Sequence, residues 1–241
     1  MKRATLEAAD SVRLTKQPLV IVTPLRGGRE IVWRPGETGL APELLEAVAR
    51  ALANDDAFVL EILGEPLFVQ PVQPPLRLVV VGAVHIAEPL VAVAGAAGYE
   101  VQIVDPRRAF ARAERWPAGV AVSTDWPDEA LARIGLDARS AVVALTHDPK
   151  IDDPALAAAL RSPAFYVGAL GSKKTHASRL RRLAAHGFDT SDLDRIFGPI
   201  GLPIGARSPG EIAVAIVAEM ISFLRRGAVR AGATQPPGAC P

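Results

Sequence analysis

One short segment fits a nucleotide-binding turn at all but one position. It reads Gly82-Ala83-Val84-His85-Ile86-Ala87 and follows an apolar run, residues 76–81, that is typical of a buried strand. The pattern Gly-x-Gly-x-x-Gly/Ala lets a backbone lie against a pyrophosphate, but Val84 takes the place of the second glycine. Asp105 ends the next predicted strand, where an acidic side chain would meet a ribose hydroxyl. The spacing favours nucleotide binding, whereas Val84 disfavours the usual pose of NAD, and an ordinary strand-to-helix turn remains the alternative.

A second group of polar side chains follows the apolar run 141–145. Thr146, His147 and Asp148 supply a hydroxyl, an imidazole and a carboxylate at one strand end, where open α/β sheets bind ligands. Such a group could transfer protons, or it could hydrogen-bond a polar ligand. In the alternative interpretation, Asp148 only caps the local backbone before Pro149.

The third segment, residues 167–183, combines glycines with basic residues. Gly168 and Gly171 allow tight turns, and Ser172 is a good N-cap for a helix that starts with Lys173 and Lys174. Because a helix N-terminus attracts anions, we expect a phosphate or an acidic ligand here. The spacing does not fit a Walker A loop. The alternative is a solvated basic helix face, which would also include His176, Arg179, Arg181 and Arg182.

Two further features are less specific. His85 stands in the first turn of a predicted helix and could donate to a phosphate or a heterocycle, although a packed or solvent-facing histidine is the alternative. The segment 198–211 is rich in glycine and proline and carries Arg207 beside a helix start. It could close one wall of a crevice, or it could be an ordinary connection.

The elements that carry these residues alternate regularly between strand and helix. Short, uniformly apolar strands separated by helices are typical of a parallel sheet covered on both faces. The expected strands are 76–81, 100–104, 120–122, 141–145 and 165–167, and the expected helices are 86–97, 127–134, one that opens at 153–154, 173–185 and 209–226. The fold class is therefore α/β, with a Rossmann-like, mostly parallel sheet.

The region before this alternation has a different pattern. Short strand-like runs surround one helical segment, which predicts a small α+β domain over residues 1–73. The proline-rich stretch 71–75 separates it from a second domain, residues 74–226. Small residues and prolines over 227–241 predict a disordered tail.

Composition limits the function classes. With 27 Lys and Arg against 26 Asp and Glu, the net charge of +1 gives no general attraction to nucleic acid. The single cysteine, Cys240, allows neither an internal disulfide nor a cysteine-based metal site within one chain. Glu7 and Asp10 follow the basic start before any apolar run, a pattern that secretory signals do not have. No apolar run reaches the roughly 20 residues that a membrane span needs. We expect a cytoplasmic protein.

Five motifs together resemble the XdhC/CoxI family. They are "RLVVVGAVHIAEPL", "VQIVDPR", "VVALTHDPKID", "YVGALGSKKTHASRLRRL" and "GLPIGARSPGEIAVAIVAEMI", in that order along the chain. The family comprises maturation factors of molybdenum hydroxylases such as xanthine dehydrogenase and carbon monoxide dehydrogenase. The resemblance implies a chaperone that binds the molybdenum cofactor, protects it, and assists its sulfuration and its insertion into the target enzyme.

The resemblance also implies a binding surface and partners, but no catalytic residue. The cargo would be molybdopterin or its dinucleotide form, which carries a phosphate and a polar pterin. The expected contacts are Gly82, Ala83, Val84, His85, Ile86, Asp105, Arg107, Thr146, His147, Asp148, Gly168, Gly171, Ser172, Lys173 and Lys174. The expected partner is the large subunit of the hydroxylase, with a cysteine desulfurase, a cofactor nucleotidyltransferase or a second copy of the chain as further candidates. An NAD(P)-dependent oxidoreductase and an assembly scaffold with a vestigial nucleotide site are the alternative functions.

Overall fold

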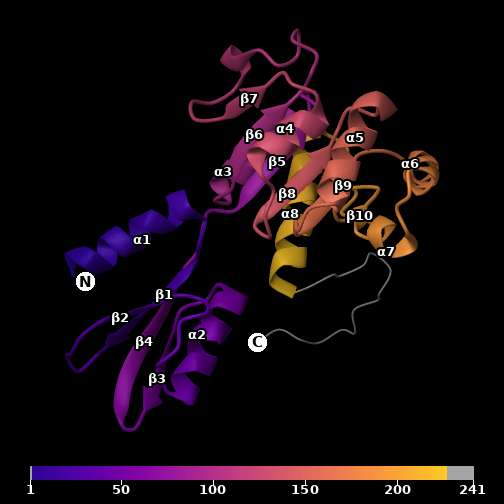
Figure 1. Cartoon of the computed structure of the whole chain (residues 1–241). Helices are drawn as coiled ribbons and strands as arrows, with labels where there is room; N and C mark the ends of the chain where they lie inside the picture. Colours follow the sequence, from indigo (N-terminus) through magenta and orange to yellow (C-terminus); the bar gives the residue numbers. More distant parts are fainter. Residues whose placement is uncertain (1, 227–241) are drawn as a thin grey trace. The chain divides into compact units, whose positions relative to one another are not determined.

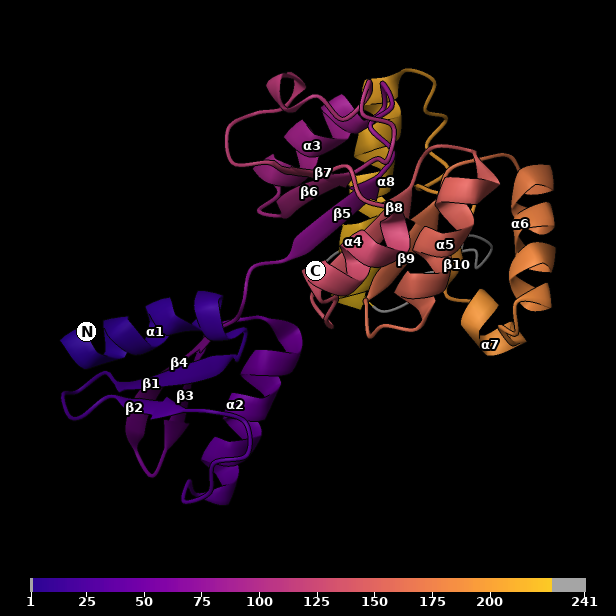
Figure 2. The same cartoon turned by 45° about the horizontal axis from the view of Figure 1, so that its top comes forward.

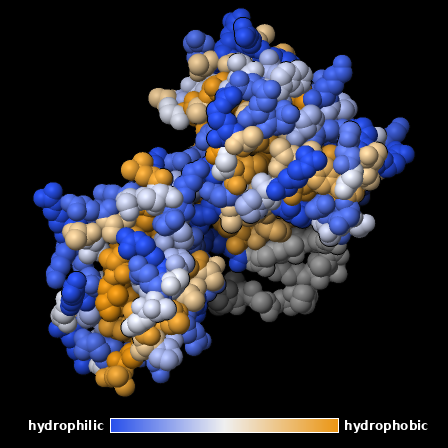
Figure 3. All heavy atoms as spheres, viewed as in Figure 1, coloured by the Kyte–Doolittle hydropathy of each residue, from blue (hydrophilic) through white to orange (hydrophobic). Residues whose placement is uncertain are grey.

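The chain divides into two compact units between Pro75 and Leu76. The structure is a computed structural model, and it describes residues 2–226 (Figure 1). The segment 227–241, for which the sequence predicts a disordered tail, lies outside the described residues. Hydrophilic residues cover much of the visible face of each unit, and smaller apolar patches interrupt them (Figure 3).

The first unit is a four-stranded antiparallel sheet with two helices. Its strands pair in the order β2-β1-β4-β3. Alternate residues of the central strand point to opposite faces, so Val20 and Val22 pack with α2, and Leu19 and Ile21 pack with α1. The elements are α1 (Arg3–Thr15), β1 (Leu19–Pro24), β2 (Ile31–Trp33), α2 (Pro42–Asn54), β3 (Phe58–Ile62) and β4 (Glu65–Val72). Sequence reasoning did not predict α1, of which only Thr5 and Val12 are buried.

The second unit confirms the predicted α/β class. Its six strands are all parallel and pair in the order β10-β9-β8-β5-β6-β7. The strands are β5 (Arg77–Val81), β6 (Glu100–Val104), β7 (Ala121–Ser123), β8 (Ser140–Ala144), β9 (Tyr166–Ala169) and β10 (Ile196–Phe197). The helices are α3 (Ala87–Ala96), α4 (Pro127–Ile134), α5 (Pro149–Leu160), α6 (Lys173–Ala185), α7 (Thr190–Leu193) and α8 (Pro209–Arg226), with a 3-10 turn, η1 (Ala113–Arg115).

Helices cover both faces of this sheet, and two apolar clusters result. On one face Leu78 and Val80 of the central strand pack with α3 and α8, and on the other Val79 and Val81 pack with α4 and α5 (Figure 2). Burial on both faces explains why the strands are apolar throughout instead of alternating. The parallel order also places the carboxyl ends of all strands at one edge of the sheet.

The start of α5 differs from the expectation. The helix begins at Pro149, not at Asp153 and Pro154, and it continues through Pro154. The reason is local: the Asp148 side chain accepts a hydrogen bond from the backbone N–H of Lys150, and Pro149 suits the first helical position. The predicted start of α8 is confirmed, because Glu211 accepts from the Ser208 N–H and donates its own N–H to the Ser208 hydroxyl.

Candidate functional site

Four segments that follow strands β6, β5, β8 and β9 form what we call the carboxyl edge: residues 105–107, 82–86, 146–148 and 170–174. Neighbouring segments touch. A β-carbon added at Gly82, which has a φ of +110°, would lie 2.5 Å from Cγ2 of Thr146, so only glycine fits there. A β-carbon added at Gly171 would lie 3.7 Å from Nδ1 of His147. The structure therefore brings together most of the residues that the sequence singled out.

Asp105 has hydrogen-bond partners within the chain. Its carboxylate is completely buried and accepts hydrogen bonds from the Ala83 N–H (2.8 Å), the Arg107 N–H (3.0 Å) and the Arg107 guanidinium. Burial alone would raise the pKa of Asp105, but the bonds from Arg107 and Ala83 outweigh it and lower the pKa below its usual value. The carboxylate therefore holds two strand-end segments together, and its contact with a ribose stays a prediction.

The turn after β5 is also partly closed by its neighbours. The Ala83 N–H is used by Asp105, and its carbonyl accepts from the guanidinium of Arg115. Val84 is half-buried against the core under α3 and α8, Ile86 is buried, and His85 is exposed. The backbone at this turn is thus less available to a pyrophosphate than in a standard dinucleotide site.

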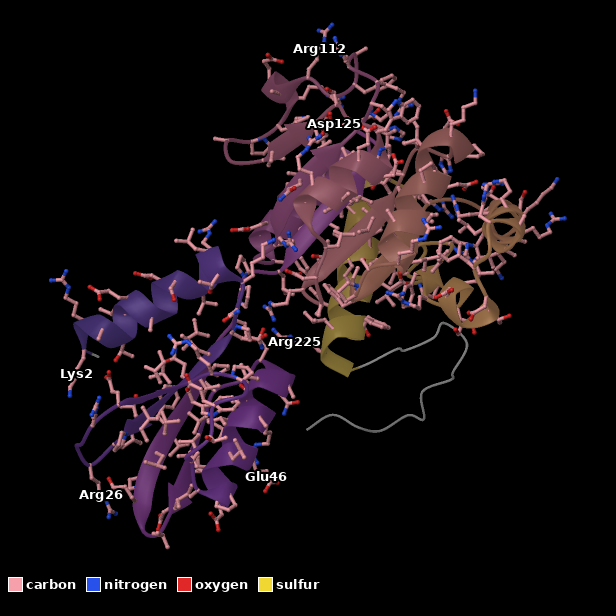
Figure 4. The ribbon with its side chains drawn as sticks, viewed as in Figure 1. Lys2, Arg26, Glu46, Arg112, Asp125 and Arg225 are labelled. Atoms are coloured by element: carbon pink, nitrogen blue, oxygen red, sulfur yellow. The ribbon has the colours of Figure 1, made fainter. Side chains whose placement is uncertain are left out.

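Arg115 is a residue that sequence reasoning missed. It lies in the segment after β6, forms an ion pair with Glu88 of α3, and donates to the carbonyls of Ala83 and Phe110. Arg112 of the same segment points outward (Figure 4). No local spacing in the sequence links Arg115 to a turn 32 residues earlier, so only the folded chain reveals the contact.

In the segment after β8, the backbone N–H groups and the Thr146 hydroxyl donate hydrogen bonds to carboxylates of the same region. Asp152 of α5 accepts from the Thr146 N–H (3.2 Å), the Thr146 hydroxyl (2.6 Å) and the His147 N–H (3.0 Å). Asp148 caps α5, so the alternative interpretation of this residue is the one the structure bears out. His147 adopts a left-handed φ of +63°, and its imidazole is exposed. Of the three predicted contacts in this segment, His147 is the one whose side chain has no hydrogen-bond partner within residues 2–226.

A buried ion pair lies behind these segments. Arg179 of α6 is 1% exposed, and its Nη2 donates to the Leu170 carbonyl (2.9 Å) and lies 3.5 Å from Oδ2 of Asp152. Burial raises the pKa of Asp152 and lowers the pKa of Arg179. Arg179 is therefore not part of an exposed basic face, as its place in the sequence suggested. Arg182 also has a partner, since it forms a bidentate pair with Asp153.

The segment after β9 is open by comparison. Ser172 caps α6 as predicted, because its hydroxyl accepts from the Thr175 N–H (3.1 Å). Lys173 and Lys174 are exposed, and within residues 2–226 no hydrogen bond leaves their backbone N–H groups. Gly168 belongs to β9 itself and is buried against Ile200, so it supports the sheet instead of facing a ligand. The N-terminus of α6 thus combines two free amides and two cations, which suits an anion.

A large groove opens beside this helix, along the edge strand β10. Its volume is about 1230 Å³, and we call it the edge groove. It lies between α6, α7, β10, the segment 198–206 and α8, and it includes Lys173 and His176 of α6 but not Lys174. The glycine- and proline-rich segment thus does form a wall, although Arg207 is not part of it. Sequence reasoning did not predict this groove.

Metal ligands do not cluster within residues 2–226, because no three histidine, cysteine or carboxylate side chains there gather closely enough to hold a metal ion. None of the described helices combines the length and the apolar character that crossing a bilayer requires.

Comparison with known proteins agrees with this architecture. The model of the XdhC Rossmann domain matches residues 78–220. The chain is 32% identical over 163 residues to a Bacillus subtilis (strain 168) protein named as a probable subunit of xanthine dehydrogenase, covering 68% of this chain and 47% of the relative. It is 31% identical over 150 residues to the molybdenum cofactor insertion chaperone PaoD of Escherichia coli (strain K12), covering 62% of this chain and 41% of the relative.

A solved structure has the same fold. A protein from Bacillus halodurans described as a xanthine dehydrogenase superposes with a TM-score of 0.70 at 24% identity, over 92% of this chain and 67% of that one. The chain spans less than half the length of the two curated relatives. Because the family model covers more than half of the sequence, the chain belongs to the family defined by the XdhC Rossmann domain.

Proposed function

We propose that this protein is a maturation factor that binds the molybdenum cofactor and assists its insertion into an enzyme of the xanthine dehydrogenase or carbon monoxide dehydrogenase type. Support comes from the XdhC Rossmann domain and from two relatives, one named a molybdenum cofactor insertion chaperone and the other a probable xanthine dehydrogenase subunit. The cofactor is cargo in this proposal. The chain's own residues bind and shield the cofactor and assist its sulfuration by presenting it. No residue of the chain is assigned a catalytic step.

One observation carries the position of the site: the N-terminus of α6 keeps its donors free. The amides of Lys173 and Lys174, their ammonium groups and the exposed His147 imidazole gather at the same part of the carboxyl edge. A phosphate accepts hydrogen bonds from backbone N–H groups and is stabilised by the helix dipole and by nearby cations. The phosphate of molybdopterin, or the diphosphate of its dinucleotide form, fits this donor set.

The geometry does not favour an NAD(P)-dependent oxidoreductase. In such an enzyme the turn after β5 would bind the pyrophosphate and Asp105 would bind the ribose. Here Asp105 is buried and holds both the Ala83 N–H and Arg107. A nicotinamide dinucleotide would have to break these bonds before it could bind in the usual pose.

The test is equilibrium binding of the full chain to molybdenum cofactor, with and without its nucleotide, beside NADH and NADPH in one buffer. We expect selective binding of a molybdenum cofactor, and at least tenfold weaker binding by Lys173→Glu/Lys174→Glu, which corresponds to about 1.4 kcal/mol. Arg181→Glu changes an exposed cation later on α6 and serves as the control. Nicotinamide binding without cofactor binding would overturn the function, and unchanged binding by the double variant would overturn the site.

The partners follow from the same proposal. We expect a complex with the large subunit of the hydroxylase in the cytoplasm, and we regard a cysteine desulfurase, a cofactor nucleotidyltransferase and a second copy of the chain as further partners. Cofactor-loaded protein should restore activity to cofactor-free hydroxylase faster than free cofactor does. Equal rates with and without the protein would show that it does not assist insertion.

A further inference from the structure

Two aromatic rings, Phe197 and Phe223, line the edge groove at an angle of 79° to each other. Tyr166 of β9 stacks on Phe197 of β10 with 4.7 Å between ring centroids and 16° between planes, and Phe223 of α8 meets Phe197 edge-on at 5.2 Å. Tyr166 is completely buried, whereas Phe197 and Phe223 are half-buried and line the groove. A planar heterocycle gains from stacking on such rings as well as from the apolar area that it buries.

A carboxylate stands beside these rings. Glu219 of α8 is 7% exposed and lines the groove. Its Oε2 accepts from the Tyr166 hydroxyl and from the Gly201 N–H (2.9 Å), while Oε1 accepts no hydrogen bond from any residue in 2–226. A carboxylate oxygen with spare acceptor capacity on a largely buried residue of the groove favours a ligand that presents N–H donors.

The wall formed by α6 adds a second unsatisfied group. Nδ1 of His176 is buried and has no hydrogen-bond partner among the described residues. The ring is held against Gly198, where an added β-carbon would lie 2.2 Å from Nδ1. Burial, together with the charge of Arg179, lowers the pKa of His176, which favours the neutral imidazole. Lys173, one turn earlier, lines the same groove.

We propose that the edge groove binds the flat, amino-substituted heterocycle of the cargo, while the N-terminus of α6 binds its phosphate. The inference rests on the proposed function and assigns the orientation of the ligand in it. Glu219 would accept from the amino and ring N–H groups of a 2-amino-4-oxo pterin. Phe197 would contact its face, and Phe223, which is nearly perpendicular to Phe197, would contact its edge. Lys173 belongs to both surfaces and would lie between ring and phosphate.

The edge groove is large enough for this assignment. Ligand pockets usually measure roughly 300–1,000 Å³, and the edge groove, at about 1230 Å³, is larger than this range. A heterocycle recognised by a carboxylate and aromatic rings would thus lie at the outer strand β10, away from the central position that the Gly82 turn suggested.

The experiment uses 6-carboxypterin as a fluorescent probe, titrated into the full chain. Its 2-oxo analogue, 6-carboxylumazine, lacks the amino group that Glu219 would bind. We expect the pterin to bind and the lumazine to bind at least fivefold more weakly. Glu219→Gln should reduce this preference to less than twofold. Failure of the wild-type chain to bind the pterin, or equal binding of both probes, would overturn the assignment.

Two further variants test the groove without touching Glu219. Phe197→Leu removes the stacking ring, and Ala206→Trp fills the groove from the segment 198–206; each should weaken pterin binding at least tenfold. The matched controls are Phe188→Leu, in the apolar cluster on the opposite face of the sheet, and Ala185→Trp, at the exposed end of α6. Circular dichroism melts show which variants fold. If Ala206→Trp folds and binds the pterin like the wild type, the assignment is wrong.

The two proposals can fail separately. In one outcome the wild-type chain and Ala206→Trp both bind the complete cofactor, and Lys173→Glu/Lys174→Glu does not bind it. The proposed function then stands, and the groove assignment fails. If the wild-type chain binds the pterin probe in the groove but not the complete cofactor, the proposed function fails and the groove remains a site for free amino-substituted heterocycles.

Discussion

The segments after β8 and β9 are neighbours at one edge of the sheet, and they use their polar groups in opposite ways. After β8, Asp148 and Asp152 accept hydrogen bonds from the amides of Thr146, His147 and Lys150. After β9, the amides of Lys173 and Lys174 remain free behind the Ser172 cap. Both segments look equally suited to a ligand in the sequence. The difference teaches that polar residues at a strand end do not by themselves leave donors free, which is why we propose the segment after β9 as the anion site.

The largest effect is expected from removing the carboxylate that closes the β8 segment. Asp152→Ala leaves the groups that it binds, including Arg179, without their partner, and should lower the free energy of unfolding by about 3–5 kcal/mol. Asp153→Ala, whose pair with Arg182 is partly exposed, should cost about 1 kcal/mol or less. Urea denaturation measures both. Equal losses would mean that the buried pair does not support the carboxyl edge.

A smaller but more selective effect should separate the two helix caps. Ser172→Ala and Asp148→Ala each remove an N-cap side chain and should each lower the free energy of unfolding by about 1 kcal/mol. Only Ser172→Ala should also weaken cofactor binding, because it disturbs the amides at the start of α6. Thermal melts and cofactor titrations provide the two readouts. If Asp148→Ala weakens binding as much, the two segments do not differ in function.

The remaining effect is a pH dependence, and it concerns Asp105, which joins the segments after β5 and β6. Its pKa is lower in the folded chain than its value of about 3.9 in the unfolded chain, so its contribution to stability is present above about pH 4. The contribution is lost as the pH falls from there through the folded pKa. In Asp105→Asn the free energy of unfolding should therefore fall less steeply as the pH is lowered below about 4. Asp128→Asn, a change at an exposed residue, should leave this pH dependence as it is in the wild type. The same pH dependence for the wild type and Asp105→Asn would contradict the hydrogen-bond assignment.

Much of the fold was predictable because its signals are local. The apolar strands, the Ser172 cap and the capping box of Ser208 and Glu211 depend on residues close together in the chain. The two-residue strand β10 and the mostly polar α1 carry too weak a pattern to be found. The start of α5 was misplaced because Asp153 and Pro154 repeat the cap signal of Asp148 and Pro149.

The site was less predictable because its decisive facts depend on distant partners. The charge of Arg179 suggested exposure, but a helix of period 3.6 places it on the same face as the buried Leu183, where it meets Asp152. The burial of Asp105 depends on the Ala83 amide, 22 residues away. The edge groove combines residues from 164 to 223, so no single motif contains it.

The buried Arg179 has a consequence for the proposed uptake of cargo. By holding the Leu170 carbonyl and lying beside Asp152, it holds the segment before α6 in place in the ligand-free chain. A preorganised site loses little conformational entropy on binding. In the proposed function we therefore expect the cofactor to bind and leave at the start of α6 without ordering or unfolding of that segment.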